Sequence, residues 1–245
     1  LWPSAEAAMN NITFDVLLHL GTLVAVFAVF YKTVWNMIRE FFKMCSMILA
    51  GTFRFRKANK YQIMSVYVIV TTLILIPFAF VQEALAQIAG NLVLVGVMLL
   101  ITAGLLFLAD HSVQGNKQMK DMKLTQAIKI GLFQGLATVP GISRSGSTIA
   151  AGINMGFDRN TMVEFSFMMS IPAILGAVVL NAREMVSGFS GADAGPYAVG
   201  TLVAAAAGIA SIKLLRYVAG KNKFGWFMWY CIAVGAAAII LGIVL

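Results

Sequence analysis

The sequence predicts an all-α polytopic membrane protein with six spans and a re-entrant helix-loop-helix. Of its 245 residues, 60% are apolar and only 11% are charged, which is about half the charge of a soluble domain. Several stretches of about 19 or more residues carry almost no charge, and a helix needs roughly 20 residues to cross a bilayer. The net charge of +8 fits orientation in a membrane, so we expect no nucleic acid partner.

Six apolar segments have the length of a span. We predict them at residues 12–31, 63–81, 91–109, 161–180, 195–218 and 226–245. The two cysteines, Cys45 and Cys231, lie far apart in the sequence, which excludes a disulfide framework or a cysteine metal cluster.

Basic residues orient these spans, because Lys and Arg accumulate in cytoplasmic loops. Seven lie in a predicted loop at residues 32–60, three precede Leu124, and four lie in residues 213–223. All three segments are therefore expected in the cytoplasm. Counting crossings from them makes residues 124–157 begin and end on the cytoplasmic side, as a re-entrant hairpin of two short apolar pieces, 124–139 and 147–157.

The order of the segments predicts one integral membrane domain, residues 1–245, built from two inverted repeats. The second repeat, residues 124–245, contains the hairpin and three spans. The first, residues 1–110, contains three spans and is incomplete at its start, since it has no hairpin. By the repeat logic, we expect a hairpin of roughly 30–40 residues before Leu1.

The tip of the hairpin gathers polar groups in an otherwise apolar segment. The sequence PGISRSGS at residues 140–147, followed by Thr148, contributes one guanidinium and four hydroxyls. An arginine at membrane depth costs at least about 2.5–3.5 kcal/mol and is normally paired or functional. If a helix begins near Ser145, its free N–H groups and positive dipole end face the same place as Arg144. These features predict a phosphate site, although Arg144 paired with a buried carboxylate, with serines that only cap helices, is the alternative.

Four further polar residues are candidates for support of this site. Gln134, inside the first short helix, is expected to bond to the loop or to a neighbouring helix, or to contact a ligand directly. Glu164 lies near the start of a span. Its carboxylate either interacts favourably with the positive end of the helix dipole or supports the site. Asp15 and His19 share a helix face, as a structural pair or as acid and base.

At these residues the sequence resembles the bacterial undecaprenyl-pyrophosphate phosphatases of the bacitracin-resistance type. The similarity is strongest in QGLATVPGISRSGSTIAAG (134–152) and continues through GFDR (156–159), EFSF (164–167) and IPAILGA (171–177). FDVLLHLGTLVAV (14–26) and FLAD (107–110) resemble the first half of the family, so the resemblance covers nearly the whole chain.

The resemblance implies an undecaprenyl-diphosphate phosphatase of the bacterial inner membrane. Such an enzyme hydrolyses a C55 isoprenyl pyrophosphate lipid to the monophosphate, with a divalent cation (Mg²⁺ or Ca²⁺) and a site that faces the periplasm. It recycles the carrier for peptidoglycan synthesis, which supports cell shape and bacitracin resistance. By the same resemblance, Arg144 is the catalytic, pyrophosphate-binding residue, and a homodimer is left open. The phosphate-binding set is Ser143, Arg144, Ser145, Gly146, Ser147 and Thr148, with Gln134 and Glu164 as support.

One family motif has no match in this sequence. Members carry two glutamates four residues apart, followed by P-x-S-S-x-G-H, and the resemblance assigns the metal ligands and the nucleophile or acid-base groups to it. We expect this motif in the hairpin before Leu1, and we expect residues 1–245 alone to be hydrolytically inactive. The alternative function is a lipid-phosphate flippase that uses the same phosphate site, because inverted repeats with broken helices are typical of transporters.

Overall fold

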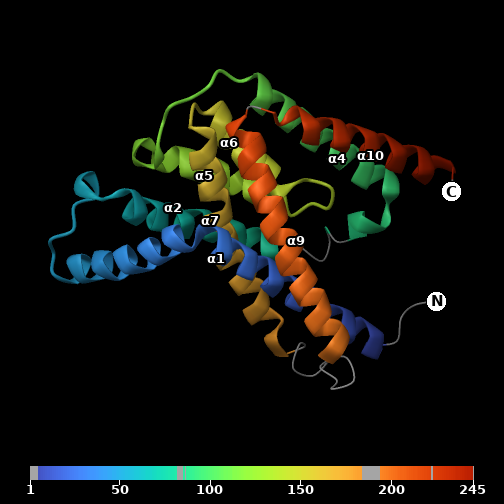
Figure 1. Cartoon of the computed structure of the whole chain (residues 1–245), viewed down its shortest axis with the longest axis horizontal. Coiled ribbons are helices and arrows are strands. Elements are labelled where there is room, and N and C mark those ends of the chain that lie inside the picture. Colours follow the sequence, from blue (N-terminus) through green and yellow to red (C-terminus); the bar gives the residue numbers. More distant parts are fainter. Residues whose placement is uncertain (1–4, 82–84, 86, 184–193, 222, 245) are drawn as a thin grey trace. The chain divides into compact units, whose positions relative to one another are not determined.

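The computed structural model describes residues 5–81, 85, 87–183, 194–221 and 223–244, which are almost entirely helical (Figure 1). Within these ranges, six helices are long and apolar enough to cross a membrane. The prediction of an all-α polytopic membrane protein is therefore confirmed.

Five of the six predicted spans match single helices to within a few residues. These helices are α2 (Lys60–Ala79), α4 (Leu92–His111), α7 (Arg159–Leu180), α9 (Ala194–Gly220) and α10 (Gly225–Val244). Two shorter helices lie between α4 and α7, α5 (Leu124–Leu136) and α6 (Arg144–Asn154). The predicted helix-loop-helix is confirmed, and its second helix begins three residues earlier than residue 147.

The first helix differs from its prediction. α1 (Ala5–Leu49) does not end at Tyr31 but continues, with a kink at Phe30, through most of the predicted basic loop. Residues 32–50 contain no Gly or Pro, and Lys, Arg, Met and Leu all favour helices. α1 ends just before Gly51, whose φ of 67° suits the left-handed position that closes many helices. The basic residues 32, 39 and 43 therefore lie on a helix and not in a loop.

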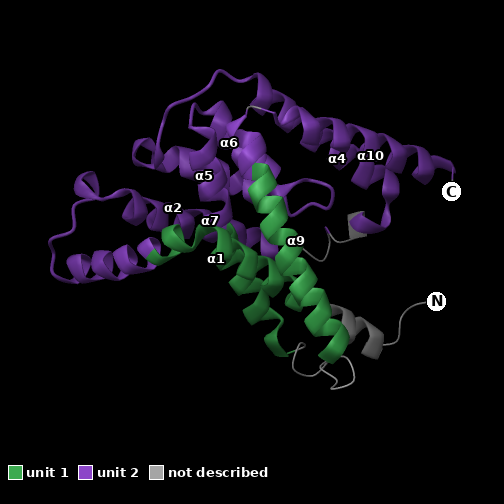
Figure 2. Ribbon diagram, viewed as in Figure 1, with its two compact units in different colours: residues 1–35, 170–215 green, residues 36–169, 216–245 purple. Residues whose placement is uncertain are grey.

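The chain forms two compact units (Figure 2). Unit 1 contains residues 1–35 and 170–215. Within it α1 packs closely on α9, because a Cβ on Gly21 would collide with the Thr201 carbonyl oxygen. The rings of Phe14 and Tyr197 stack at 5.7 Å between the same two helices. Small residues thus permit the close helix contact that is typical of membrane proteins.

Unit 2 contains residues 36–169 and 216–245, and therefore the whole helix-loop-helix. α4 packs against α10 where Gly96 faces Gly235, and α5 packs against α2 where Gly131 faces Thr71. The Tyr67 hydroxyl of α2 donates to the Met122 carbonyl at 2.8 Å, just before α5 begins. The hairpin is therefore held on one side by α2 and on another by α4, whose contacts with the loop are described below.

Candidate anion site at the start of helix α6

The loop between α5 and α6 turns sharply at Gly141. Its φ is 94°, a backbone conformation that side chains disfavour. A Cβ at this position would also lie 2.7 Å from the Val95 carbonyl oxygen and 2.8 Å from the Cβ of Met98. The loop therefore lies directly against α4, and only glycine fits both the turn and the contact.

Thr102 of α4 fixes the far end of this loop. Its buried hydroxyl accepts a hydrogen bond from the Ser143 N–H at 3.0 Å and donates to the Gly141 carbonyl at 3.1 Å. Two backbone groups of a turn inside an apolar protein are thus satisfied by one side chain. Sequence reasoning missed Thr102, because a single threonine in an apolar span has no motif around it.

Ser143 caps α6. Its Oγ accepts from the Gly146 N–H at 3.1 Å, which is the usual arrangement at a helix N-terminus. The N–H groups of Arg144 and Ser145 belong to the first turn, where no carbonyl lies four residues earlier in the helix. The positive end of α6 therefore opens at the position of Arg144, as the sequence predicts.

Arg144 is half-buried at this helix end. Its guanidinium makes no hydrogen bond or ion pair with any residue that the structure describes. The alternative that Arg144 pairs with a buried carboxylate has no support among the described residues. The Ser145 hydroxyl, also half-buried, makes no hydrogen bond in the same part of the chain.

Ser147 and Thr148 face the interior instead. Thr148 is buried, and its hydroxyl bonds to the Arg144 carbonyl at 2.9 Å and to the Ser166 hydroxyl of α7 at 2.8 Å. Ser147 is also buried, and its hydroxyl has no partner in the described structure. Thr148 thus joins α6 to α7, while Ser147 keeps a free polar group inside the hairpin.

The supporting candidates make different contacts. Gln134 of α5 is buried, and its amide nitrogen has no partner among the described residues. Glu164 forms an ion pair with Lys60 at the start of α2, with a distance of 2.7 Å between Nζ and Oε2. Glu164 therefore ties α7 to α2.

In unit 1, Asp15 and His19 are both exposed. The His19 Nδ1 bonds to the Asp15 backbone carbonyl at 2.7 Å. The ring thus contacts backbone, which agrees with a local structural pair.

The described residues do not assemble a metal site. No group of three or more His, Cys, Asp or Glu side chains within the described ranges is placed to hold a metal ion. The candidate site therefore consists of the Arg144 guanidinium, the N-terminus of α6 and the Ser145 hydroxyl, groups that are suited to an anion.

Comparison with known proteins agrees with this chemistry. The family model described as bacitracin resistance protein BacA matches residues 2–237. A protein of Methanosphaera stadtmanae named undecaprenyl-diphosphatase is 32% identical over all of this chain and 90% of its own length. Proteins with the same name from Halothermothrix orenii and Alkaliphilus metalliredigens are 36% and 34% identical, over 95% and 93% of this chain and 84% and 83% of their own lengths. The chain therefore belongs to the BacA family.

Proposed function

We propose that this membrane protein hydrolyses undecaprenyl pyrophosphate to undecaprenyl phosphate and phosphate, and that Arg144 binds the pyrophosphate. The assignment rests on Arg144, which is half-buried at the start of α6 and whose guanidinium has no partner among the described residues. A desolvated cation that the protein itself does not neutralise is suited to an anionic ligand. The family relatives supply the identity of that ligand, because their names are those of a diphosphatase.

The residues of the loop contribute in different ways to binding the headgroup. The planar fork of Arg144 matches two phosphate oxygens at once. The first-turn N–H groups and the Ser145 hydroxyl add donors beside it. Thr102 and Gly141 hold the loop in this conformation, so the donors are placed before the lipid arrives. Such preorganised donors stabilise the charge that develops when a phosphoanhydride bond breaks.

A divalent cation, Mg²⁺ or Ca²⁺, remains part of the proposal by family resemblance. It would neutralise phosphate charge. The described residues offer no group of three or more side-chain ligands for it. If phosphate release persists unchanged after exhaustive chelation, the cation is not required.

The proposed location is the bacterial plasma membrane, with the anion site open to the periplasm. Support comes from the basic residues at 32–60 and 213–223, which favour the cytoplasmic side. The long isoprenyl tail would then stay in the lipid, and only the headgroup would enter the hairpin.

Phosphate release from undecaprenyl pyrophosphate in detergent tests this function. Hydrolysis releases one phosphate per lipid, whereas a flippase releases none. Arg144→Lys keeps the charge and loses the fork, so we expect kcat/KM to fall about 10- to 100-fold, the range for a lost bidentate, charge-assisted contact. Arg56→Lys, on an exposed arginine outside the hairpin, is the matched control and should leave the rate unchanged. Normal turnover by the Arg144→Lys protein would contradict the role of Arg144.

A further inference from the structure

Helix α1 is longer than a bilayer is thick. The apolar part of it, Thr13–Leu49, has 37 residues, and this corresponds to about 55 Å of helix against a hydrocarbon core of about 30 Å. The kink at Phe30, with φ of −111° and ψ of 24°, divides the helix near the point where a span that starts at Thr13 has crossed the bilayer. The part after the kink, residues 31–49, must therefore lie at or beyond the membrane surface.

An apolar stripe of exposed side chains runs along this post-kink segment. Within unit 2 it consists of Ile38, Phe42 and Leu49, whose exposed fractions are 45%, 68% and 89%. Trp35 and Tyr31 continue it on the same helix at helical spacing, 66% and 62% exposed. Successive steps of four, three, four and seven residues place all five on one helix face. The buried side chains of the segment, Thr33, Val34, Glu40 and Met44, lie on other sides of the helix.

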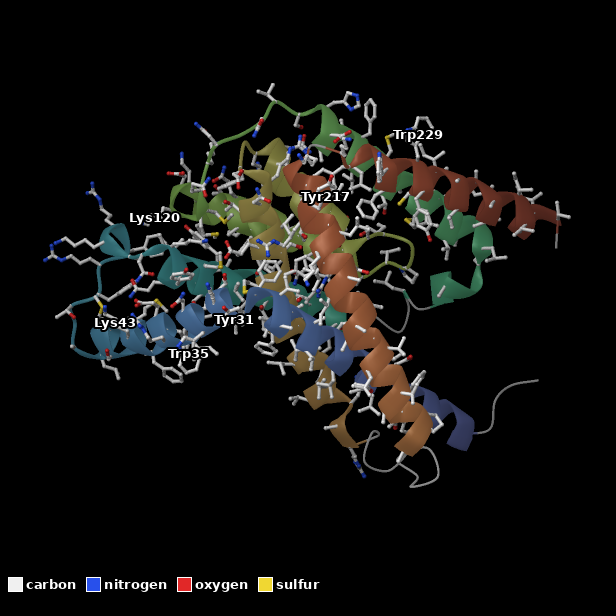
Figure 3. The ribbon with its side chains drawn as sticks, in the orientation of Figure 1. Tyr31, Trp35, Lys43, Lys120, Tyr217 and Trp229 are labelled. Atoms are coloured by element: carbon white, nitrogen blue, oxygen red, sulfur yellow. The ribbon has the colours of Figure 1, made fainter. Side chains whose placement is uncertain are left out.

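A basic edge lies next to the stripe. Lys32, Arg39 and Lys43 are exposed, and at about 100° per residue they lie roughly a quarter turn from the apolar stripe. Figure 3 labels Tyr31, Trp35 and Lys43 along this helix. Three more exposed basic residues, Arg54, Arg56 and Lys57, follow the end of the helix.

Glu40, the one acidic residue in the sequence from 32 to 60, does not offset the positive charge of this exposed surface. Glu40 is buried, and its carboxylate accepts from Asn59 Nδ2 at 2.6 Å and from Gln62 Nε2 at 3.1 Å. The Arg39 guanidinium lies 3.7 Å from it, with 71% of the Arg39 side chain exposed, so this contact leaves Arg39 largely in solvent. The exposed charge of the whole segment is therefore positive.

We propose that the post-kink segment of α1 lies along the cytoplasmic surface of the membrane and binds anionic phospholipid. The apolar stripe, rich in aromatic rings, enters the boundary between headgroups and acyl chains, and the basic edge meets the lipid phosphates. A second copy of the chain fits this surface less well, because helices paired through the stripe would bring two basic edges together. The proposal rests on the membrane location of the chain, and it does not depend on phosphate hydrolysis.

Spin labels on the whole protein in lipid nanodiscs test the position of the segment. In a Cys45→Ser, Cys231→Ala background, single cysteines replace Ile38, Phe42 or Arg39, and collision rates with oxygen and with a water-soluble nickel complex give the depth. We expect labels at 38 and 42 to lie about 5–10 Å into the boundary region, and a label at 39 at the headgroups. Free access of the nickel complex to position 42 would overturn the proposal. Spin-spin broadening that disappears on dilution with unlabelled protein would also overturn it, in favour of contact between copies.

Removal of the basic charges, in the same spin-label experiment, tests whether the segment binds anionic lipid. The triple change Lys32→Gln, Arg39→Gln, Lys43→Gln should lower the oxygen-to-nickel ratio at position 42 at least threefold in bilayers with phosphatidylglycerol. It should have no effect in phosphatidylcholine alone. The control changes Lys120, Lys213 and Lys221, all exposed and outside the segment, to Gln; Figure 3 labels Lys120. An equal effect of the control triple, or no effect of the first triple with the anionic lipid, would contradict anionic phospholipid binding.

Discussion

A threonine with no motif around it organises the proposed anion site. Because Thr102 bonds to both Ser143 N–H and Gly141 carbonyl, Thr102→Val leaves two loop groups without a partner in an apolar protein. We expect the free energy of unfolding in detergent to fall by about 1–3 kcal/mol, and the affinity for pyrophosphate to fall with it. Thr102→Ser should retain both. Thr72→Val is the control, since the Thr72 hydroxyl bonds only to a carbonyl of its own helix; an equal loss there would show that the loop contacts are not the cause.

The bond between Thr148 and Ser166 is a second residue-scale contact with a measurable energy. Thr148→Val leaves the Ser166 hydroxyl unpaired, because the two hydroxyls bond to each other at 2.8 Å. Each single change, Thr148→Val or Ser166→Ala, should lower the free energy of unfolding by about 1 kcal/mol, and the double change by less than the sum. Strict additivity in this double-mutant cycle would contradict the contact between α6 and α7.

At the scale of elements, two glycines with positive φ allow the cost of backbone strain to be measured apart from the cost of a steric collision. Gly141 has φ of 94° and lies against α4, whereas Gly51 has φ of 67° with nothing within 4 Å of an added Cβ. Gly51→Ala should cost about 1–2 kcal/mol of unfolding free energy from the backbone alone. Gly141→Ala adds the collision with Val95 and should cost more, as measured by thermal unfolding in one detergent. Equal losses would mean that the loop does not rest on α4.

The sequence predicted the elements better than their ends. Apolar length located the spans, and the paired short segments around PGISRSGS located the helix-loop-helix. The sequence did not predict that α1 extends past Tyr31. The segment after the kink carries as many basic residues as a cytoplasmic loop, so its charge did not distinguish a helix from a loop. The first residue of α6 also depended on a tertiary contact, since Thr102 holds Ser143 in its capping position. Periodicity alone does not reveal such a bond.

The whole molecule offers a test of orientation. Basic residues favour the cytoplasm for residues 32–60, and counting crossings then places the start of α9 outside. In the background without native cysteines, an impermeant thiol reagent added to intact cells should modify a cysteine at Ala194 and spare one at Lys57, both exposed positions. Permeabilised cells serve as the control, because both positions should then react. The reverse labelling pattern in intact cells would contradict the proposed topology.

The sequence predicts the residues of the candidate anion site, but it does not predict which way each hydroxyl faces. The string from residue 140 to 148 placed Arg144 next to the start of a helix, and the structure has α6 begin at Arg144 itself. The string did not distinguish Ser145, which points to no described partner, from Thr148, which bonds to α7. That distinction depends on which face of α6 meets α7, and a single short helix does not contain this information in its sequence.

Binding of the pyrophosphate group by Arg144 can be measured as the affinity for a non-hydrolysable farnesyl methylenediphosphonate, by calorimetry in detergent on protein shown to be folded. We predict that Arg144→Lys weakens binding about 10- to 100-fold, as expected for loss of a bidentate charge-assisted contact, and that Arg144→Ala weakens it further. The exposed control Arg56→Lys should bind like the unaltered protein. An unchanged dissociation constant for Arg144→Lys and Arg144→Ala would contradict binding of the pyrophosphate group by Arg144.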